Sequence, residues 1–426
     1  MEKRLQKLTA YLDSAHSVYH SIAGVVQALE SAGYTALSEA DGWELVPGGK
    51  YYLVRGGTAL LAFRIPAETP AGFLITASHA DRPCFKLKEN GELTGTYTRL
   101  SVERYGGMII APWLDRPLGV AGRVLVQTDA GIESRLVDLD RDLMLIPNVA
   151  IHMNRTVNEG YKWDLTKDVL PLLGGKDAAG KLESMLKEAA GGEILAHDLF
   201  AYVREKAKVW GVDGEYLSAA ALDDLACVWG CTQGFLNAGE SGSIPVLAVF
   251  DNEEVGSSSN QGADSNLLEL TLERICNGLR LEKGRLLANS MMVSADNAHA
   301  LHPNHPELAD PKNAPVLGEG LVVKFNSTLR YTTDGLSAAL LRTACQKAGV
   351  KTQTYYNRAD MPGGSTLGCI SLNHVSVPCV DIGLPQLAMH SSYETCAVAD
   401  LLALEDAMAA YYGSTLQQDN GAWRLA

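Results

Sequence analysis

The chain has 426 residues, of which 46% are hydrophobic and 20% charged, and its formal net charge is −14. This composition is that of an ordinary globular protein, and the length exceeds what one hydrophobic core usually holds, so two domains are expected. The acidic balance and the lack of a basic run disfavour nucleic acid or an anionic membrane as a partner.

The N-terminus and the cysteines indicate a cytosolic protein. The first residues are charged and lead into a polar segment, and no stretch approaches the ~20 apolar residues of a membrane span. The eight cysteines are scattered without a Cys-x-x-Cys pair. Buried thiols in a reducing compartment are therefore expected rather than disulfides or zinc fingers.

The spacing of apolar residues predicts an α/β fold interrupted by a β-rich insert. Helical spacing over 3–31 precedes strands over 51–65 and 73–78; short strands then follow over 107–111, 123–127 and 133–138, a polar helix covers 181–190, and a helical pattern resumes at 219–230. We expect a mostly parallel central sheet with flanking helices, divided into a first segment of the α/β domain (1–90), an inserted β-rich domain (91–216) and a second segment of the α/β domain (217–426).

Several apolar, strand-like runs end at a residue that can bind a metal. The runs starting at 73, 244 and 290 end next to His79, next to Glu253 and Glu254, and at Asp296, and a fourth run at 375–381 precedes a short loop with His390. Ligands of parallel sheets gather at the carboxyl ends of the strands. The sequence thus predicts a cluster of imidazoles and carboxylates at one edge of the sheet.

The adjacent carboxylates of Glu253 and Glu254 would repel each other in a buried site. A cation or a shared proton would relieve that repulsion, so one carboxylate could hold a metal while the other transfers protons.

Each residue also has a simpler structural explanation. His79 alone could be a hydrogen-bonded strand end, Asp296 a helix cap, and Asp223 with Asp224 a solvated first turn. Taken together at sheet-edge positions, these residues favour a site. The cluster of His299, His302 and His305 is interrupted by prolines that prevent a helix from aligning the rings, so we assign it no metal.

An ordered set of motifs extends across essentially the whole chain. Its segments are His79-Ala-Asp-Arg-Pro-Cys, Ala221-Leu-Asp-Asp-Leu, Asp251-Asn-Glu-Glu-Val-Gly-Ser, Ser294-Ala-Asp-Asn-Ala-His and Gln386-Leu-Ala-Met-His-Ser, with supporting segments at 113–123, 146–152 and 364–368. This ordered set resembles the aspartyl aminopeptidase (M18) family of binuclear zinc metallopeptidases.

The resemblance implies a metalloaminopeptidase that removes the N-terminal residue from peptides with a free N-terminus. It implies that Asp223 bridges two divalent ions, that Glu253 is the general base and that Asp81 orients a ligand imidazole. Zinc is the expected metal, although cobalt and manganese accept the same ligands. The implied metal ligands are His79, Asp223, Glu254, Asp296 and His390.

The resemblance also implies a homododecamer built from dimers, with the β-rich insert mediating the pairing. In such an assembly His152 would reach the active site of a neighbouring subunit and stabilise the oxyanion. A histidine packed beside a hairpin of the insert is the competing interpretation.

Lys324 is the residue that bears on specificity. The resemblance places it near the side chain of the substrate's N-terminal residue, where a cation would favour Asp or Glu; a surface lysine beside a strand is the alternative. Two departures from the family pattern also bear on substrate choice, namely Asp224 in place of a common Asn and Ser392-Tyr393 in place of Ile-Arg. An aminopeptidase of neutral residues, a small-amide hydrolase and a non-catalytic scaffold therefore remain alternatives.

Overall fold

The protein was analysed as a computed structural model, which describes residues 2–426. The helices of the described chain are α1 (Glu2–Leu12), α2 (Val18–Ser31), α3 (Lys181–Ala190), α4 (Leu222–Asn237), α5 (Leu267–Leu279), α6 (Lys283–Leu287), α7 (Gly335–Lys347), α8 (Leu367–Ser371) and α9 (Val398–Tyr412). The helical pattern predicted over 3–31 is thus two helices, and Ser17 caps the second by accepting a hydrogen bond from the backbone N–H of His20.

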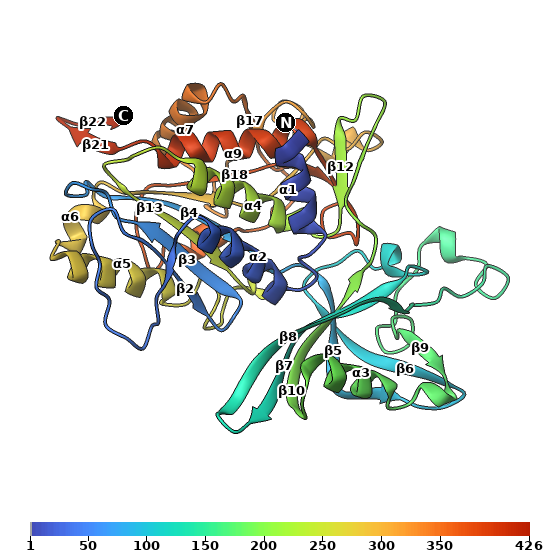
Figure 1. Ribbon diagram of the computed structural model, residues 1–426. Coiled ribbons are helices and arrows are strands. Elements are labelled where there is room, and N and C mark those ends of the chain that lie inside the picture. Colours follow the sequence, from blue (N-terminus) through green and yellow to red (C-terminus); the bar gives the residue numbers. More distant parts are fainter. Residues whose placement is uncertain (1) are drawn as a thin grey trace.

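A nine-stranded sheet forms the centre of the larger body (Figure 1). In spatial order its strands are β1 (Thr35–Ala36), β2 (Lys50–Arg55), β3 (Ala59–Arg64), β13 (Ile244–Phe250), β4 (Phe73–His79), β14 (Met291–Ala295), β18 (Cys379–Gly383), β16 (Leu321–Lys324) and β17 (Thr352–Tyr355).

The central strands β13, β4, β14 and β18 are mutually parallel, as predicted. The sheet as a whole is mixed, because β3 is antiparallel to both β2 and β13, and β16 is antiparallel to β18, whereas the outermost pairs are parallel. The turn between Arg55 and Ala59 is too short for a parallel crossover, so β2 and β3 form a hairpin.

Helices cover both faces of this sheet and bury a separate core on each (Figure 1). Leu74 of β4 belongs to the core with α1, α2, α4, α7 and α9, whereas its neighbours Phe73 and Ile75 belong to the core with α5, α6 and α8. This alternation follows from the two-residue period of a strand. Strands buried on both faces explain the nearly continuous apolar runs in the sequence.

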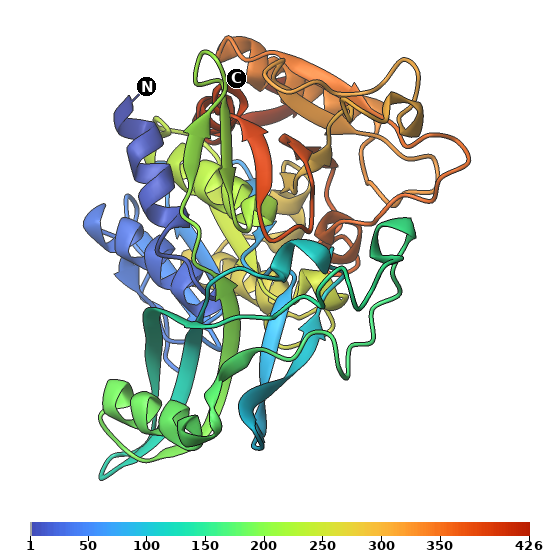
Figure 2. The ribbon, with the colours of Figure 1, turned by 90° about the vertical axis from the view of Figure 1, so that its right-hand side faces the viewer.

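A six-stranded sheet forms a second body beside the first (Figures 1 and 2). Its strands, in spatial order, are β8 (Gly131–Met144), β7 (Leu118–Thr128), β10 (Ile194–Val203), β5 (Cys84–Leu93), β6 (Tyr97–Tyr105) and β9 (Leu172–Gly175). Helix α3 packs on it through Leu182 and Leu186, which join a third apolar core.

The strands predicted at 123–127 and 133–138 lie within β7 and β8, and the predicted helix over 181–190 is α3. The strand predicted at 107–111 is wrong, since this segment is a bend that leads into the short helix η1 (Ala111–Trp113). Its backbone bonds to a loop instead of a strand: the N–H of Ile109 donates to the carbonyl of His390 at 2.9 Å.

A five-stranded sheet joins strands that are distant in the sequence. Its order is β11 (Lys208–Trp210), β12 (Tyr216–Ala219), β20 (Glu394–Ala397), β19 (Pro385–Leu387) and β15 (Ala298–His299). A hairpin of β21 (Leu416–Asp419) and β22 (Ala422–Leu425) ends the fold. Over residues 2–426, no helix combines the length and the apolar character that crossing a bilayer requires.

Candidate metal centre

The neighbouring strands β13, β4 and β14 deliver polar side chains to one edge of the central sheet. His79 is the last residue of β4 and pairs in register with Phe250, the last residue of β13. Glu253 and Glu254 follow β13 in the short helix η4 (Glu253–Val255), and Asp296 directly follows β14. Because these strands are parallel, their carboxyl ends meet, as the sequence predicted.

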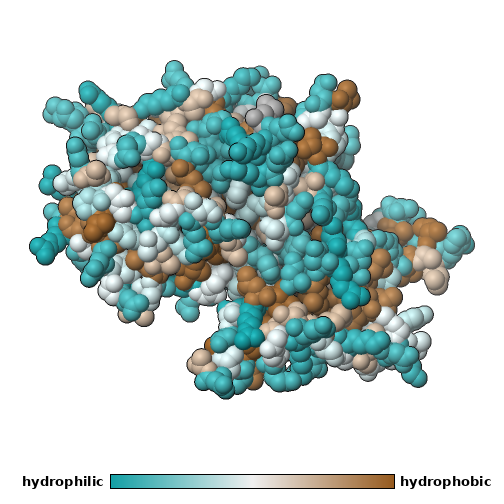
Figure 3. All heavy atoms as spheres, in the orientation of Figure 1, coloured by the Kyte–Doolittle hydropathy of each residue, from teal (hydrophilic) through white to brown (hydrophobic). Residues whose placement is uncertain are grey.

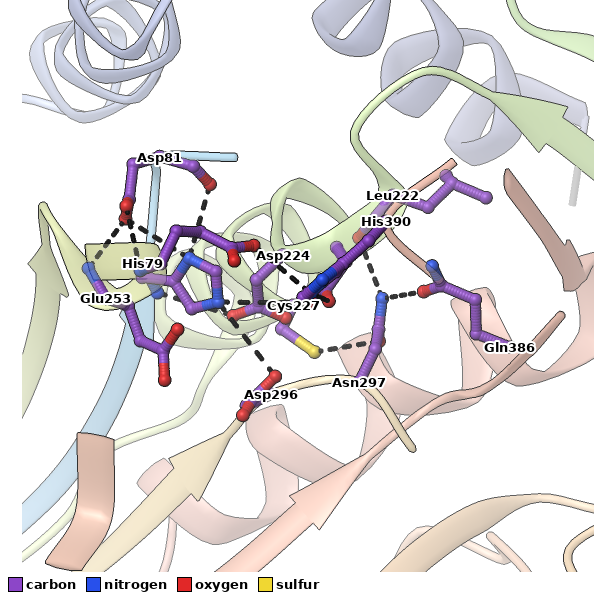
Figure 4. A network of polar contacts seen from close by, with 12 residues as sticks. His79, Asp81, Leu222, Asp224, Cys227, Glu253, Asp296, Asn297, Gln386 and His390 are labelled. Atoms are coloured by element: carbon purple, nitrogen blue, oxygen red, sulfur yellow. Dashed lines mark hydrogen bonds and ion pairs between the residues drawn. The ribbon is translucent and has the colours of Figure 1, made fainter. Parts of the chain in front are cut away.

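Two further side chains reach this edge from other elements. Asp223 stands at the start of α4, where its backbone is not yet helical. His390 lies in the loop after β19 and has a positive φ of 65°. Figure 4 shows the imidazole of His390 and the ring of His79 converging on the carboxylates between them.

The structure brings all the predicted ligand side chains together. His79 Nε2 lies 3.8 Å from Asp223 Oδ1 and 3.9 Å from Asp296 Oδ1. His390 Nε2 lies 3.4 Å from Asp223 Oδ2 and 3.4 Å from Glu254 Oε1.

Potential ligand atoms within 4.8 Å of one another form three groups: His79 with Asp223 and Asp296; Asp223 with Glu254 and His390; and His79 with Glu253 and Glu254. The first two groups share Asp223.

Burial and mutual repulsion dominate the electrostatics of these carboxylates. Burial raises the pKa of Glu254 well above its ordinary value, and the negative charge of Asp223 adds to this effect. Burial likewise raises the pKa of Glu253 to about 7, against the opposing effect of His79. For His390, burial lowers the pKa, but Asp223 and Glu254 outweigh it and raise the value to about 10. Ionised together, these carboxylates need a compensating positive charge.

The donor atoms fit divalent zinc. Asp223 Oδ1 and Glu254 Oε1 are buried without a hydrogen-bond partner in the described chain. Buried oxygens without a partner are costly, and carboxylate oxygens with imidazole nitrogens are the donors zinc takes besides thiolates. These side chains could therefore hold a metal.

The ring nitrogens that face away from the cluster are bound to the backbone. His390 Nδ1 lies 2.5 Å from the carbonyl oxygen of Gly107, and His79 Nδ1 lies 3.2 Å from the carbonyl oxygen of Asp81. A carbonyl only accepts, so each Nδ1 carries a proton, which leaves Nε2 as the atom that would bind a metal once the ring is neutral. Metal-binding histidines are commonly oriented in this way.

Asp81 lies directly behind the cluster. Its Oδ1 accepts a hydrogen bond from the backbone N–H of Glu253 at 3.2 Å, and its Oδ2 accepts one from Glu254 N–H at 3.1 Å. Asp81 Oδ1 also lies 3.3 Å from His79 Nδ1. One carboxylate therefore touches the segments that carry three of the clustered side chains.

Lys324 is buried, with 1% of its surface exposed, so the alternative of a surface lysine is wrong. Its Nζ donates to the carbonyl oxygens of Asp296 at 2.8 Å and Asn297 at 3.3 Å, and lies 3.5 Å from Asp296 Oδ2. Burial lowers the pKa of Lys324, but the Asp296 carboxylate outweighs it and raises the pKa above the ordinary value. The lysine thus adjoins the cluster through Asp296.

His152 is an exposed residue. It occupies an exposed turn in the long loop between β8 and β9. None of the three ligand groups found in residues 2–426 includes it.

The histidines at 299, 302 and 305 line a cavity of about 290 Å³ together with Tyr355 and Met389. The rings of His302 and His305 are 5.2 Å apart between centroids.

Sequence reasoning missed the residues that support the site. Glu394 accepts hydrogen bonds from the backbone of Asp223 and His390, and Tyr105 donates to Asp81. Asp224 is fully buried and its Oδ2 accepts from the backbone N–H of His79 at 3.3 Å. The available signal was a lone Glu in the short segment Glu394-Thr-Cys-Ala, where an acidic residue needs a partner.

Fold and donor set together define a metal-dependent hydrolase of the α/β class. The family model described as "Aminopeptidase I zinc metalloprotease (M18)" matches residues 11–412. The chain belongs to this M18 family and is a zinc-dependent aminopeptidase.

Known proteins resemble the chain over nearly its full length. A "Probable M18 family aminopeptidase 2" of Clostridium novyi is 40% identical over 414 residues, covering 93% of this chain and 96% of the relative. The cryo-EM structure of the Ape4 and Nbr1 complex contains a chain with a TM-score of 0.92 and 30% identity, covering 96% of this chain and 85% of that one. The structure described as a "S. cerevesiae mApe1 dodecamer" gives a TM-score of 0.84 at 25% identity, covering 96% and 95%.

Proposed function

We propose that the cluster holds two zinc ions and that Asp223 bridges them. The observation that carries this proposal is that one ligand group contains His79 and Asp296, another contains Glu254 and His390, and Asp223 belongs to both. Two cations a few ångströms apart repel each other, and a shared carboxylate between them offsets that repulsion. Zinc is the metal of the family description, while cobalt and manganese suit the same donors.

Glu253 is proposed as the general base for hydrolysis of the first peptide bond. Bound zinc would lower the pKa of a water molecule and polarise the scissile carbonyl. Glu253 then accepts the proton of the attacking water and passes it to the leaving amine. Its place beside His79 and Glu254 in one ligand group supports this role, since a base must lie within reach of the water.

Asp81 is proposed as a positioning residue. By accepting hydrogen bonds from the backbone of Glu253 and Glu254, and by lying against the ring of His79, its carboxylate fixes the base relative to the ligands. Such supporting contacts are commonly worth 10–100-fold in metal affinity or activity.

The proposed substrates are peptides with a free N-terminus that begins with Asp or Glu. Lys324 supports the acidic preference, because it is a buried cation that adjoins the cluster through Asp296. The alternative is a neutral N-terminal residue. It is favoured by the engagement of Lys324 Nζ with two backbone carbonyls and by the apolar side chains of Met361 and Met389 in the cavity beside His299.

A peptide panel tests both the activity and the preference. Zinc-loaded protein is incubated with peptides that differ only at the N-terminal residue, and released amino acids are quantified by mass spectrometry. Release confined to Asp and Glu supports Lys324 as the specificity cation, and release of Leu or Met favours the neutral alternative. A lack of any release would leave a small-amide hydrolase or a non-catalytic scaffold in its place.

The assembly is proposed to be a homododecamer that pairs through the six-stranded sheet and its loops. The dodecamer described for the yeast relative supports this proposal. The loop that carries His152 also exposes Val149, Ile151 and Met153, with 79% of Met153 exposed, and apolar residues appear on that side of the molecule in Figure 3. Exposed apolar side chains on a projecting loop are typical of a protein interface.

In this assembly His152 is proposed to enter the site of a neighbouring subunit and stabilise the oxyanion. Its exposure on the loop, and the fact that it belongs to none of the ligand groups found in residues 2–426, are consistent with a role in trans.

A further inference from the structure

Glu394 is a buried carboxylate that contacts the two segments bringing Asp223 and His390 to the site. Its Oε2 accepts a hydrogen bond from the backbone N–H of Asp223 at 2.9 Å, and its Oε1 accepts one from the backbone N–H of His390 at 2.7 Å. Only 1% of the Glu394 surface is exposed, so water does not compete for these bonds. A single side chain thereby joins a helix start to a loop about 170 residues away in sequence.

The sheet topology explains how one residue reaches both segments. Glu394 begins β20, which lies between β12 and β19 in the five-stranded sheet. The segment with Asp223 follows β12, and Ala219 at the end of β12 pairs directly with Glu394. The segment with His390 follows β19, whose last residue pairs with Thr395. Both segments therefore leave the sheet beside the first residue of its middle strand.

Both backbone segments need an external hydrogen-bond acceptor. Asp223 has non-helical dihedral angles at the start of α4, and a buried N–H that lacks a partner is costly. His390 has a φ of 65°, in the left-handed region that residues other than glycine rarely adopt, so its conformation depends on the contacts around it. Glu394 accepts a hydrogen bond from the N–H of His390, and the N–H of Ile109 donates one to the carbonyl oxygen of His390. The carbonyl oxygen of Gly107 accepts one from its ring.

We infer that Glu394 is a positioning residue that sets the separation between the Asp223 carboxylate and the His390 imidazole. The inference rests on the proposed function, because these two side chains belong to the ligand group with Glu254. Within residues 2–426, the Glu394 carboxylate forms hydrogen bonds to backbone N–H groups only, so it acts through the segments it contacts. Asp81 does the same for Glu253 and Glu254 on the other side of the cluster.

The test compares Glu394→Gln and Glu394→Ala with Glu405→Gln in the full chain. A glutamine has one acceptor oxygen and one NH2 group, so it can hold one of the two segments and repels the other N–H. Glu405 is a matched control: it is also a buried glutamate, with 3% exposure, but it pairs with Arg4 instead of the site.

Zinc affinity is measured by competition with a chromophoric chelator, with size-exclusion chromatography as a check on assembly. Both Glu394 variants are expected to bind zinc about tenfold or more weakly than the parent, the range for residues that support metal ligands, while Glu405→Gln binds with parental affinity. Parental affinity and stoichiometry in both Glu394 variants would overturn the inference.

Hydrogen exchange of the metal-free protein provides a readout that does not depend on zinc. Peptides containing Asp223 and His390 are expected to exchange faster in the Glu394 variants, and unchanged exchange in both peptides would refute the positioning role. If the parent protein binds no zinc while these peptides do respond, the proposed metal centre fails and the role of Glu394 in holding the segments survives.

Discussion

The phenol of Tyr105 donates a hydrogen bond to Asp81 Oδ2 at 2.6 Å, so the last residue of β6 in the six-stranded sheet touches the candidate site of the helix-flanked body. The same hydroxyl accepts a hydrogen bond from the Asn252 side chain at 3.0 Å. Gly107 and Ile109, just beyond β6, bind the ring and the carbonyl oxygen of His390. The second body therefore contributes to the surroundings of the site within the same chain.

Tyr105→Phe is expected to lower kcat/KM about tenfold, because Asp81 loses a donor that fixes its carboxylate behind Glu253 and Glu254. Steady-state kinetics on one peptide measure the effect. Tyr97→Phe is the control, since Tyr97 also lies on β6 but is 61% exposed. Equal kcat/KM values for the two variants would show that Tyr105 does not support the site.

Glu253→Gln is expected to lower kcat by about 10²–10⁴-fold or more while the zinc content stays at the parental value, because the amide cannot accept the proton of the attacking water. Zinc content is measured by atomic emission on dialysed protein. Glu254→Gln serves for comparison and is expected to lose zinc. Undiminished turnover by Glu253→Gln would rule out this residue as the base.

His152→Phe is expected to reduce turnover without loss of zinc or of assembly. Co-assembly with Glu253→Gln distinguishes the two ways in which the histidine could act. If His152 serves a neighbouring site, mixed oligomers regain activity, since a subunit with intact Glu253 receives His152 from its neighbour. Mixed oligomers no more active than the two variants assembled separately would contradict a role in trans.

Asp400 is expected to make stability fall as pH rises. It is buried in the first turn of α9 and accepts hydrogen bonds from the backbone of Gly318 and Gly320. Burial raises its pKa from 3.8 to about 6. The folded state therefore holds a proton that the unfolded state has released, so the contribution of Asp400 is fully present below pH 3.8 and lost through pH 6.

Urea unfolding of the metal-free parent and of Asp400→Asn at pH 5 and pH 8 measures this contribution. From pH 5 to pH 8 the free energy of unfolding of the parent is expected to fall by on the order of 1 kcal/mol relative to that of the variant, because the amide does not titrate. Other buried carboxyls cancel in the difference. A difference independent of pH would show that Asp400 keeps an ordinary pKa.

Gly234→Ala is expected to destabilise the fold by about 1–3 kcal/mol, although alanine favours a helix interior. A Cβ at Gly234 of α4 would lie against the side chain of Met408 and 2.9 Å from the backbone nitrogen of Ala409 in α9. Gly239→Ala is the control, since its Cβ would meet nothing within 4 Å. Thermal melting of both variants checks the prediction, and equal melting temperatures would contradict it.

The strands that form the site edge were predictable, because their apolar runs are buried on both faces and end at polar residues. The runs ending near His79, Glu253 and Asp296 are β4, β13 and β14. The flanking glycines, Gly180 and Gly191, also gave α3 its bounds. The pattern failed at 107–111, where apolar residues follow Gly106 and Gly107 into a bend whose backbone bonds to His390.

The sequence by itself determined the α/β class, the family resemblance and the residue types gathered at one sheet edge, since these depend on local periodicity and on motifs within short segments. Only the tertiary structure decided that Lys324 is buried against Asp296, that Glu394 joins the Asp223 and His390 segments, and that Tyr105 touches Asp81. Apart from the bond between Glu394 and His390, which are neighbours in the sequence, these contacts join residues from about 24 to 170 positions apart. Their formation depends on how separate sheets pack, which no local pattern encodes.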